Sequence, residues 1–360
     1  MIHHYNKLTS DSIGLITKAV FSLVFAFSIV GLVHAQQTNS YKSETNLSQP
    51  VDTQPIKTQD PENLVIFYQG INLDQNEFLE SLLFQLKSER PQYHYQLVNI
   101  AQLSKNAINA YYNQATHCAV TIGLETTQKI LSLRNPVKTF ALSLSRLQLD
   151  KLNQTYQRLN IEVSGIYKEQ SFARQIALAQ ALEPELKQVG SLFGQADKYY
   201  LPEFQQTANE KGFQLNFQIL QMANSGESYL TRVVDNNGYF VLLNNSQIYQ
   251  KSKLANLVLA ASHHQIKLIG NLFESSQLGA IASVYTPTNE LLKEASKDIS
   301  AYCQNNPTAQ SAKISPHYAK GFSVMVNHPM AENFGISELN IYDLTNKIAT
   351  MEKDKRNQHE

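Results

Sequence analysis

The fold of this chain is decided by the stretch from Gly238 to Tyr285, which reads GYFVLLNNSQIYQKSKLANLVLAASHHQIKLIGNLFESSQLGAIASVY. A hydrophobic run over 239–243 stops at a polar turn, and an apolar pattern at helical spacing follows over 247–264. A second hydrophobic run covers 266–272, and a run of small residues, 279–285, closes the stretch. Strand, crossover helix and strand in this order predict parallel strands that are buried on both faces.

The same alternation extends on the N-terminal side of this stretch. Strand patterns at 64–68, 93–100, 118–122 and 137–142 alternate with helical patterns at 76–88, 101–113 and 127–133. After a change at 163–166, helix 171–182, strand 188–193, helix 201–211, strand 213–220 and a helix near 225–234 lead back to the opening stretch. Alternation every 25–35 residues or so predicts an α/β fold with two doubly wound, Rossmann-like lobes and a cleft between them.

The tail after Tyr285 alternates less regularly. Its apolar pattern predicts helices at 289–303, 329–334 and 341–351, with a strand at 322–327.

Composition and the N-terminus indicate an exported protein. The 360 residues carry 30 basic and 30 acidic side chains, so no basic surface points to nucleic acid as a partner. Lys7 and Lys18 precede an uncharged apolar run over 19–33, and the small residue Ala35 offers a cleavage site. We expect a signal peptide, 1–35, that directs the chain to the periplasm and is cleaved after Ala35. An uncleaved N-terminal anchor is the alternative.

The segment 36–62 is polar and has almost no hydrophobic pattern. It cannot bury enough apolar surface to offset the entropy of ordering, so we expect a disordered linker there.

Cysteine and histidine usage gives no metal site. An exported chain permits a disulfide between Cys118 and Cys303, its two cysteines. Because Cys118 lies in an apolar strand pattern, we favour two buried thiols. His263 and His264 are adjacent on a predicted helix and point to different faces, so we interpret them as surface residues.

Motifs for cofactors and catalysis are missing from the sequence. Gly165, Gly190, Gly194 and Gly238 form no G-x-G-x-x-G pattern, and no G-x-S-x-G occurs. We therefore expect no cofactor, and we do not expect an enzyme.

Three segments, taken in order, resemble a known family. They are VGSLF at 189–193, GAIASVY at 279–285 and MVNHPMAENFGI at 325–336. Together they resemble the periplasmic substrate-binding proteins of ABC transporters that include the tryptophan- and tyrosine-type binders. The resemblance covers roughly residues 63–345, and the C-terminal segment is its most specific part.

The resemblance implies a type I periplasmic-binding fold with hinge crossovers between two lobes. Residues 163–165 resemble the family's first crossing, and 282–284 resemble its second. The N-terminal lobe is then expected to comprise 63–164 and the C-terminal lobe 165–283, each with part of 284–350.

Polar turns at the carboxyl ends of the strands supply the expected ligand contacts, since ligands bind at that edge of parallel sheets. By position and by resemblance, the expected ligand-binding residues are Tyr68, Gln69, Thr126, Thr127, Gln195, Asn245, Ser246, Glu274 and Tyr285. The hydroxyl and amide side chains among them would hold a zwitterion or another small polar molecule at helix N-termini.

Each of these assignments has an ordinary structural alternative. Thr126, Thr127, Asn245 and Ser246 are also common N-capping types. Glu125 and Glu274 would either bind a ligand amine or be solvated loop carboxylates. Tyr68, Phe273 and Tyr285 would either stack on a ligand or pack in the core.

Two functions follow from the resemblance. The first is the periplasmic solute-binding component of an ABC uptake system, which closes over a small molecule and delivers it to an inner-membrane permease. The second is a periplasmic sensory or interaction protein of the same fold, which docks on an envelope receptor domain without transport.

Overall fold

The computed structural model describes most of the chain after residue 62. The described residues are 63–70, 73–114, 118–133, 138–159, 161, 163–220, 229–235, 238–244, 251–304, 314–336 and 339–357. The predicted signal peptide and linker lie outside them. None of the helices in the described ranges combines the length and the apolarity that spanning a membrane requires.

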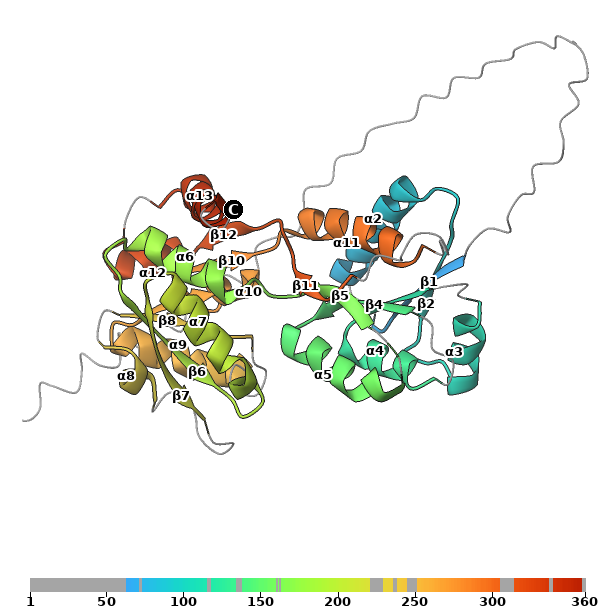
Figure 1. Ribbon diagram of the computed structural model, residues 1–360, viewed down its shortest axis with the longest axis horizontal. Coiled ribbons are helices and arrows are strands. Elements are labelled where there is room, and N and C mark those ends of the chain that lie inside the picture. Colours follow the sequence, from blue (N-terminus) through green and yellow to red (C-terminus); the bar gives the residue numbers. More distant parts are fainter. Residues whose placement is uncertain are drawn as a thin grey trace, which may run out of the picture. The chain divides into compact units, whose positions relative to one another are not determined.

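The first sheet has six strands in the order β11-β5-β4-β3-β1-β2, and all its neighbours pair in parallel (Figure 1). Its strands are β1 (Asn63–Tyr68), β2 (His94–Asn99), β3 (Cys118–Ile122), β4 (Lys138–Leu144), β5 (Val163–Tyr167) and β11 (His317–Tyr318). Consecutive residues of β1 alternate between two apolar clusters: Leu64 and Ile66 enter one, Val65 and Phe67 the other. Both faces of the sheet are therefore buried, as the hydrophobic runs predict.

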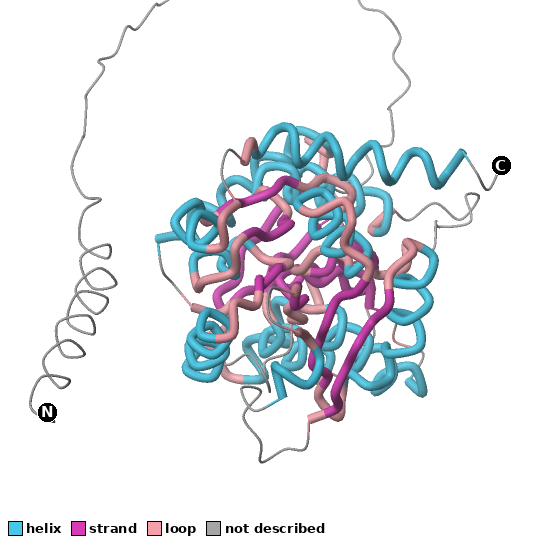
Figure 2. Tube along the Cα trace, turned by 90° about the vertical axis from the view of Figure 1, so that its left-hand side faces the viewer, coloured by secondary structure: helices cyan, strands magenta, loops and turns pink. Residues whose placement is uncertain are grey.

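Helices cover both faces of this sheet, and we call the whole the first lobe. One face carries α2 (Leu73–Glu89) and α11 (Thr288–Tyr302), which also pack against each other. The other face carries α3 (Lys105–Tyr112), α4 (Leu124–Leu131) and α5 (Arg146–Tyr156), which is followed by the 3₁₀ turn η1 (Gln157–Leu159). Figure 2 shows the strands enclosed by helices.

The second sheet has the order β12-β10-β9-β8-β6-β7, and only β12 runs antiparallel to its neighbour. Its strands are β6 (Gln188–Phe193), β7 (Gln214–Ile219), β8 (Tyr239–Val241), β9 (Lys267–Gly270), β10 (Ala282–Tyr285) and β12 (Ser323–Val326). The helices of this second lobe are α6 (Phe172–Leu182), α7 (Leu201–Glu210), α8 (Leu230–Val233), α9 (Lys251–His263), α10 (Phe273–Gln277), α12 (His328–Asn333) and α13 (Ile341–Asn357), with the 3₁₀ turn η2 (Asp197–Tyr200).

The opening stretch of the sequence forms the βαβ unit that it predicts. Strands β8 and β9 pair in parallel, with Tyr239 opposite Lys267, and α9 is their crossover. Between the second hydrophobic run and the run of small residues lies the short helix α10, which the sequence analysis did not predict. The predicted fold class, two doubly wound α/β lobes with crossovers between them, is confirmed.

The chain passes between the two sheets three times, over 168–171, 286–287 and 319–322. The residues expected at the first two crossings, 163–165 and 282–284, instead pair within β5 and β10, and the passage begins just after each strand. The third crossing follows β11, which has only two residues and no sequence signal of its own.

Two helices differ from expectation for local reasons. Helix α5 was not predicted, although Ser145 and Gln148 form a capping box at its start. Helix α4 begins at Leu124, so the prediction that this helix begins at 127 is wrong. Gly123 has φ 86° and turns the chain directly from β3 into the helix, a conformation that favours glycine.

The prediction of two free thiols is wrong, because Cys118 and Cys303 form a disulfide. Cys118 is the first residue of β3, in the middle of the first sheet. Cys303 directly follows α11, which covers the face of the sheet that Cys118 enters. The two residues are 185 apart in sequence, so only the folded position of α11 brings them together.

Candidate functional site

A pocket of about 580 Å³ lies at the carboxyl edge of the first sheet. The ends of β1, β3 and β4 meet there, as parallel strands require. Its lining residues are Tyr68, Gln69, Gly70, Phe78, Leu79, Ile122, Gly123, Leu124, Glu125, Thr126 and Ser143. Three of the predicted ligand-binding residues, Tyr68, Gln69 and Thr126, are among them.

The amino end of α4 forms one wall of this pocket. The first intrahelical hydrogen bond runs from the Thr127 amide to the Gly123 carbonyl, at 3.1 Å. The amides of Leu124, Glu125 and Thr126 precede that bond, so they are the ones a helix start leaves for an outside acceptor. An anionic group such as a carboxylate fits such a position, since the helix dipole adds to the hydrogen bonds.

A charged network lies beside the same helix start. The Lys129 ammonium lies 3.3 Å from a Glu125 oxygen and donates to the Gln69 side-chain oxygen at 3.1 Å. Hydrogen bonds from Gln69 and then from Lys129 lower the pKa of Glu125. The exposed Glu125 is therefore ionised at the edge of the pocket, in an ion pair with Lys129.

The two threonines of α4 have different roles. Thr126 is buried and lines the pocket. The Thr127 hydroxyl donates to the Gly123 carbonyl at 2.8 Å and lies 2.9 Å from the Thr121 hydroxyl. The Thr127 side chain therefore links α4 to β3, and its hydroxyl hydrogen is already bonded to the Gly123 carbonyl.

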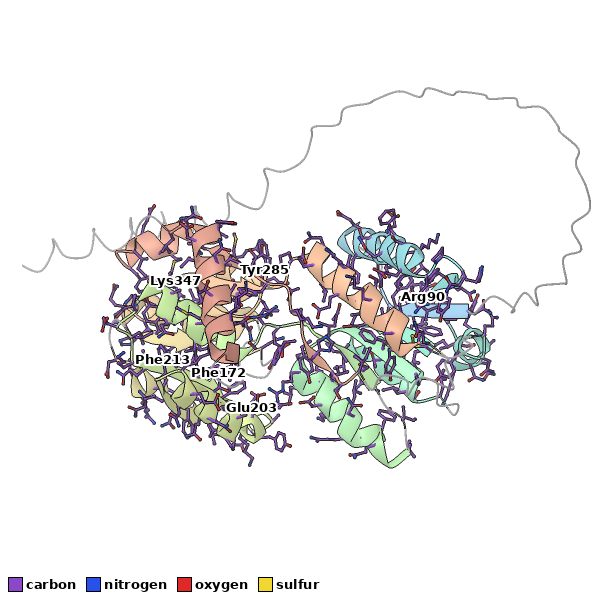
Figure 3. All side chains as sticks on the ribbon, turned by 45° about the horizontal axis from the view of Figure 1, so that its top comes forward. Arg90, Phe172, Glu203, Phe213, Tyr285 and Lys347 are labelled. Carbon is purple, nitrogen blue, oxygen red and sulfur yellow. A yellow bond between two sulfur atoms is a disulfide. The ribbon has the colours of Figure 1, made fainter. Side chains whose placement is uncertain are left out.

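The other predicted ligand-binding residues do not line this pocket. Gln195 follows β6 and donates to the Leu220 carbonyl at 3.3 Å, and Glu274 is exposed on α10. Tyr285, labelled in Figure 3, ends β10 and packs edge-on against Phe273, with ring centroids 5.1 Å apart. Asn245 and Ser246 lie outside the described residues.

A second, smaller pocket of about 40 Å³ is lined by residues of both lobes. Its lining residues are Arg146, Leu147, Glu169, Gln170, Gln175, Asp197, Tyr200, Phe204, Leu243, Asn244, Asn271 and Tyr318. Glu169, at the first crossover, is buried and accepts hydrogen bonds from the Arg146 amide at 2.9 Å and the Asn244 side chain at 3.2 Å. Burial raises the pKa of Glu169, and these hydrogen bonds offset only part of that rise.

Arg146 joins the helix α5 of the first lobe to the helix α7 of the second. Its guanidinium donates to both oxygens of Glu203, at 2.7 and 2.6 Å, and lies over the Tyr200 ring at 4.5 Å (Figure 3 labels Glu203). The Tyr200 hydroxyl donates to Asp150 on α5 at 2.8 Å. These contacts hold polar side chains of both lobes around the small pocket.

Sequence reasoning missed the residues of this second pocket. One signal was present: the Ser145–Gln148 capping box places Arg146 at the first position of a helix, directly after β4. A second lay at Ser171, whose side chain caps α6 and fixes the end of the crossover that carries Glu169. The pairing of Arg146 with Glu203 has no local signal, because the two are 57 residues apart.

Comparison with known proteins adds a family and a fold. The profile of a family described as ABC transporter substrate binding protein matches residues 100–341. No curated protein matches the chain by sequence.

Solved structures that are similar to this chain include the following three. A conserved domain protein from Vibrio cholerae is 15% identical with a TM-score of 0.52, over 78% of this chain and 97% of that one. An ABC domain from Streptococcus pneumonia in complex with L-Trp is 15% identical with a TM-score of 0.50, over 77% and 96%. A ligand-free, open substrate binding protein with adhesive properties from Clostridium difficile is 12% identical with a TM-score of 0.58, over 78% and 96%. At these identities the structures show the fold alone.

Proposed function

Because the chain belongs to the family of ABC transporter substrate binding proteins, we propose that it is the solute-binding component of an ABC-type uptake system. It closes its two lobes over a small polar molecule such as an amino acid. The ligand then passes to an inner-membrane permease, which is the expected protein partner.

The observation that carries this proposal is the chemistry of the pocket in the first lobe. The amino end of α4 offers backbone amides to a ligand carboxylate. Glu125, kept ionised beside Lys129, offers a carboxylate to a ligand ammonium group. A volume of about 580 Å³ accommodates a molecule of amino-acid size with room for a side chain.

Closure over the ligand uses the three crossovers. A ligand that contacts both lobes stabilises the closed arrangement by its extra contacts there, whether the closed form exists beforehand or follows binding. The predicted second-lobe contacts are Asn245, Ser246, Gln195, Glu274 and Tyr285. They would meet the ligand only after closure.

Export is part of the same proposal. Members of this family act outside the cytoplasm, and the N-terminal pattern fits a signal peptide removed after Ala35. The mature protein would then work in the periplasm, as a binding protein and not as an enzyme.

A metabolite screen tests the proposal. We expect one class of small zwitterions to raise the thermal midpoint and to reduce the radius measured by small-angle X-ray scattering. For that ligand, Glu125→Gln should weaken binding about 10- to 100-fold, the range for one hydrogen bond to a charged group. Glu185→Gln, an exposed acid away from the pocket, is the matched control and should bind normally. If no metabolite changes either measurement, the transport function is refuted.

A further inference from the structure

Two acids and a histidine converge in the first lobe, away from both pockets. Glu294 and Asp298 are four residues apart on α11, so they share one face of that helix. His317 opens β11, the edge strand of the first sheet (Figure 1). One ligand atom from each residue lies within 4.8 Å of the other two.

We propose that Glu294, Asp298 and His317 form a binding site for a divalent first-row transition metal ion, with zinc as the best fit. The site is independent of the solute pocket, so it goes beyond the proposed transport function.

The distances suit one ion. The His317 Nε2 atom lies 3.4 Å from Glu294 Oε1 and 3.1 Å from Asp298 Oδ2. Zinc bonds nitrogen and carboxylate oxygen at about 2.0–2.2 Å in a tetrahedron, which puts neighbouring ligand atoms about 3.4 Å apart. Three protein ligands leave a fourth position for water. One imidazole with two carboxylates is a mixed set of the kind that borderline metals accept.

Outer contacts already orient two of the three ligands. The Nδ1 atom of His317 lies 3.1 Å from the Ser315 carbonyl, so it carries the hydrogen that this contact needs and leaves Nε2 free. The other oxygen of Glu294, Oε2, accepts the Lys320 amide at 2.8 Å. Such supporting hydrogen bonds are typical of metal ligands, because they hold the donor atom in position.

The three inner atoms can share one cation between them. Glu294 Oε1 and Asp298 Oδ2 are inaccessible to solvent, and the group that faces both of them within the described part of the chain is His317 Nε2. With Nε2 unprotonated, three acceptor atoms face one point, and a divalent ion would neutralise both carboxylates. The side chains are 13, 18 and 28% exposed, which leaves a path for the ion to enter.

A proton is the competing occupant. Hydrogen bonds to Asp298 and then to Glu294 raise the pKa of His317 to about 10, so the metal-free site holds an imidazolium paired with both acids. The two carboxylates and the imidazolium together carry a net charge of −1. With a divalent ion and a neutral imidazole, the net charge of the site is zero. A metal-binding experiment therefore distinguishes the protonated, metal-free site from the site with a bound divalent ion.

The position of the site gives the ion a structural role. Helix α11 follows the second crossover, and the third crossover begins two residues after His317. A metal would join α11 to the sheet edge at the point where the chain leaves for the second lobe.

Zinc titration of the chelator-treated full-length protein tests the site, with a chromogenic zinc indicator as competitor. We expect one zinc ion per chain and a higher thermal midpoint with zinc. His317→Gln and Asp298→Asn should each weaken zinc binding more than about 100-fold, beyond the 10- to 100-fold that loss of a supporting contact costs. Cobalt bound in place of zinc should give the visible spectrum of four-coordinate cobalt in wild type and lose it in both variants.

The controls separate this site from other histidines. His263→Gln changes an exposed histidine on α9 and should leave zinc affinity unchanged. Circular dichroism and the metal-free thermal midpoint show whether each variant folds, and Asp298→Asn keeps the imidazole if His317→Gln does not fold. Wild type that binds no zinc, which would mean an ion pair only, overturns the proposal. Binding that survives both variants, or that depends on His263, also overturns it.

Discussion

The sheets of the two lobes have corresponding strand orders, and the lobes differ in what occupies the carboxyl edge of the sheet. In the first lobe that edge opens into the pocket beside α4. In the second lobe the described part of that edge borders the smaller pocket of about 40 Å³, where the chain's own polar groups bond to one another. Asp197 accepts the Gly194 amide at 3.1 Å, and Gln175 donates to the Leu242 carbonyl at 2.7 Å. The carboxyl edge of a doubly wound sheet can bind a ligand only where its polar groups are not already bonded within the protein, so we expect the solute to bind the first lobe first.

The lobes also differ in how their sheets are held. A covalent bond, Cys118–Cys303, ties α11 to the first sheet. The second sheet instead depends on close packing at Gly190, where an added Cβ would lie 2.7 Å from the Val233 carbonyl oxygen and nearer still to Val234. We expect that disrupting the disulfide or the packing at Gly190 lowers stability only in the lobe that contains it.

The largest expected effect is that of Cys118→Ala. Removing the crosslink should lower the free energy of unfolding of the first lobe by about 2–4 kcal/mol, the usual range for a disulfide. Hydrogen exchange read by mass spectrometry should show faster exchange in β1–β4 and little change in β6–β9. Cys303→Ala is the matched variant and should give the same pattern. Equal losses in both lobes would contradict the separation of the two.

Gly190→Ala is the reciprocal test in the second lobe. Overpacking should cost about 1–3 kcal/mol there, because the new methyl meets backbone as well as a side chain. Protection should fall in β6–β9 while β1–β4 stay protected. Gln188→Ala, an exposed change in the same strand, should alter neither set. The comparison fails if the first lobe loses protection instead.

Glu169→Gln probes the junction between the lobes through its dependence on pH. The pKa of Glu169 is raised in the folded state, so the stability that its protonated form provides is complete below the unfolded value of about 4.3 and is lost as pH rises through the folded value. Wild type should therefore lose up to about 1.4 kcal/mol of unfolding free energy per pH unit across that window, and the Gln variant should not. Urea unfolding at pH 5 and pH 8 measures the difference.

As pH rises, we expect the free energy of unfolding of the Gln variant to increase relative to that of wild type. Glu185→Gln, an exposed acid, is the matched control and should run parallel to wild type. A parallel result for Glu169→Gln would show that this carboxyl group titrates as if solvated.

The smallest effect belongs to the pair that links the lobes, Arg146 and Glu203. The Glu203 side chain is 53% exposed, so a double-mutant cycle with Arg146→Lys and Glu203→Gln should give a coupling below about 1 kcal/mol. Salt near 1 M should reduce it further, because the screening length falls to about 3 Å. A coupling above about 2 kcal/mol would mean that the lobes are held together far more tightly than an exposed pair allows.

The sequence predicts a feature well when the pattern that indicates it lies within one short segment of the chain. Hydrophobic runs such as 118–122 and 188–193 locate the strands well, because burial on both faces leaves a continuous apolar run. Tyr68, Gln69 and Thr126 line the pocket, and their place there could be predicted because each lies at or just after the end of a buried strand, where ligands bind parallel sheets.

The remaining features depend on contacts between distant segments. The disulfide, the Arg146–Glu203 pair and the approach of His317 to α11 each join residues that no local pattern connects. Strand β11 is too short to leave a periodic signal, although its pairing with β5 places His317. Helix α5 was the avoidable omission, since its capping box is local.

The triple passage of the chain between the sheets has a consequence for biosynthesis. The first sheet is incomplete until Tyr318 has been made, and the second until Val326, so neither half can finish before almost the whole polypeptide has emerged from the ribosome. The two lobes therefore cannot fold one after the other during synthesis, as separate domains generally do. Truncation anywhere before β11 would leave both halves damaged, and a stop codon there should yield no surviving fragment with a native core.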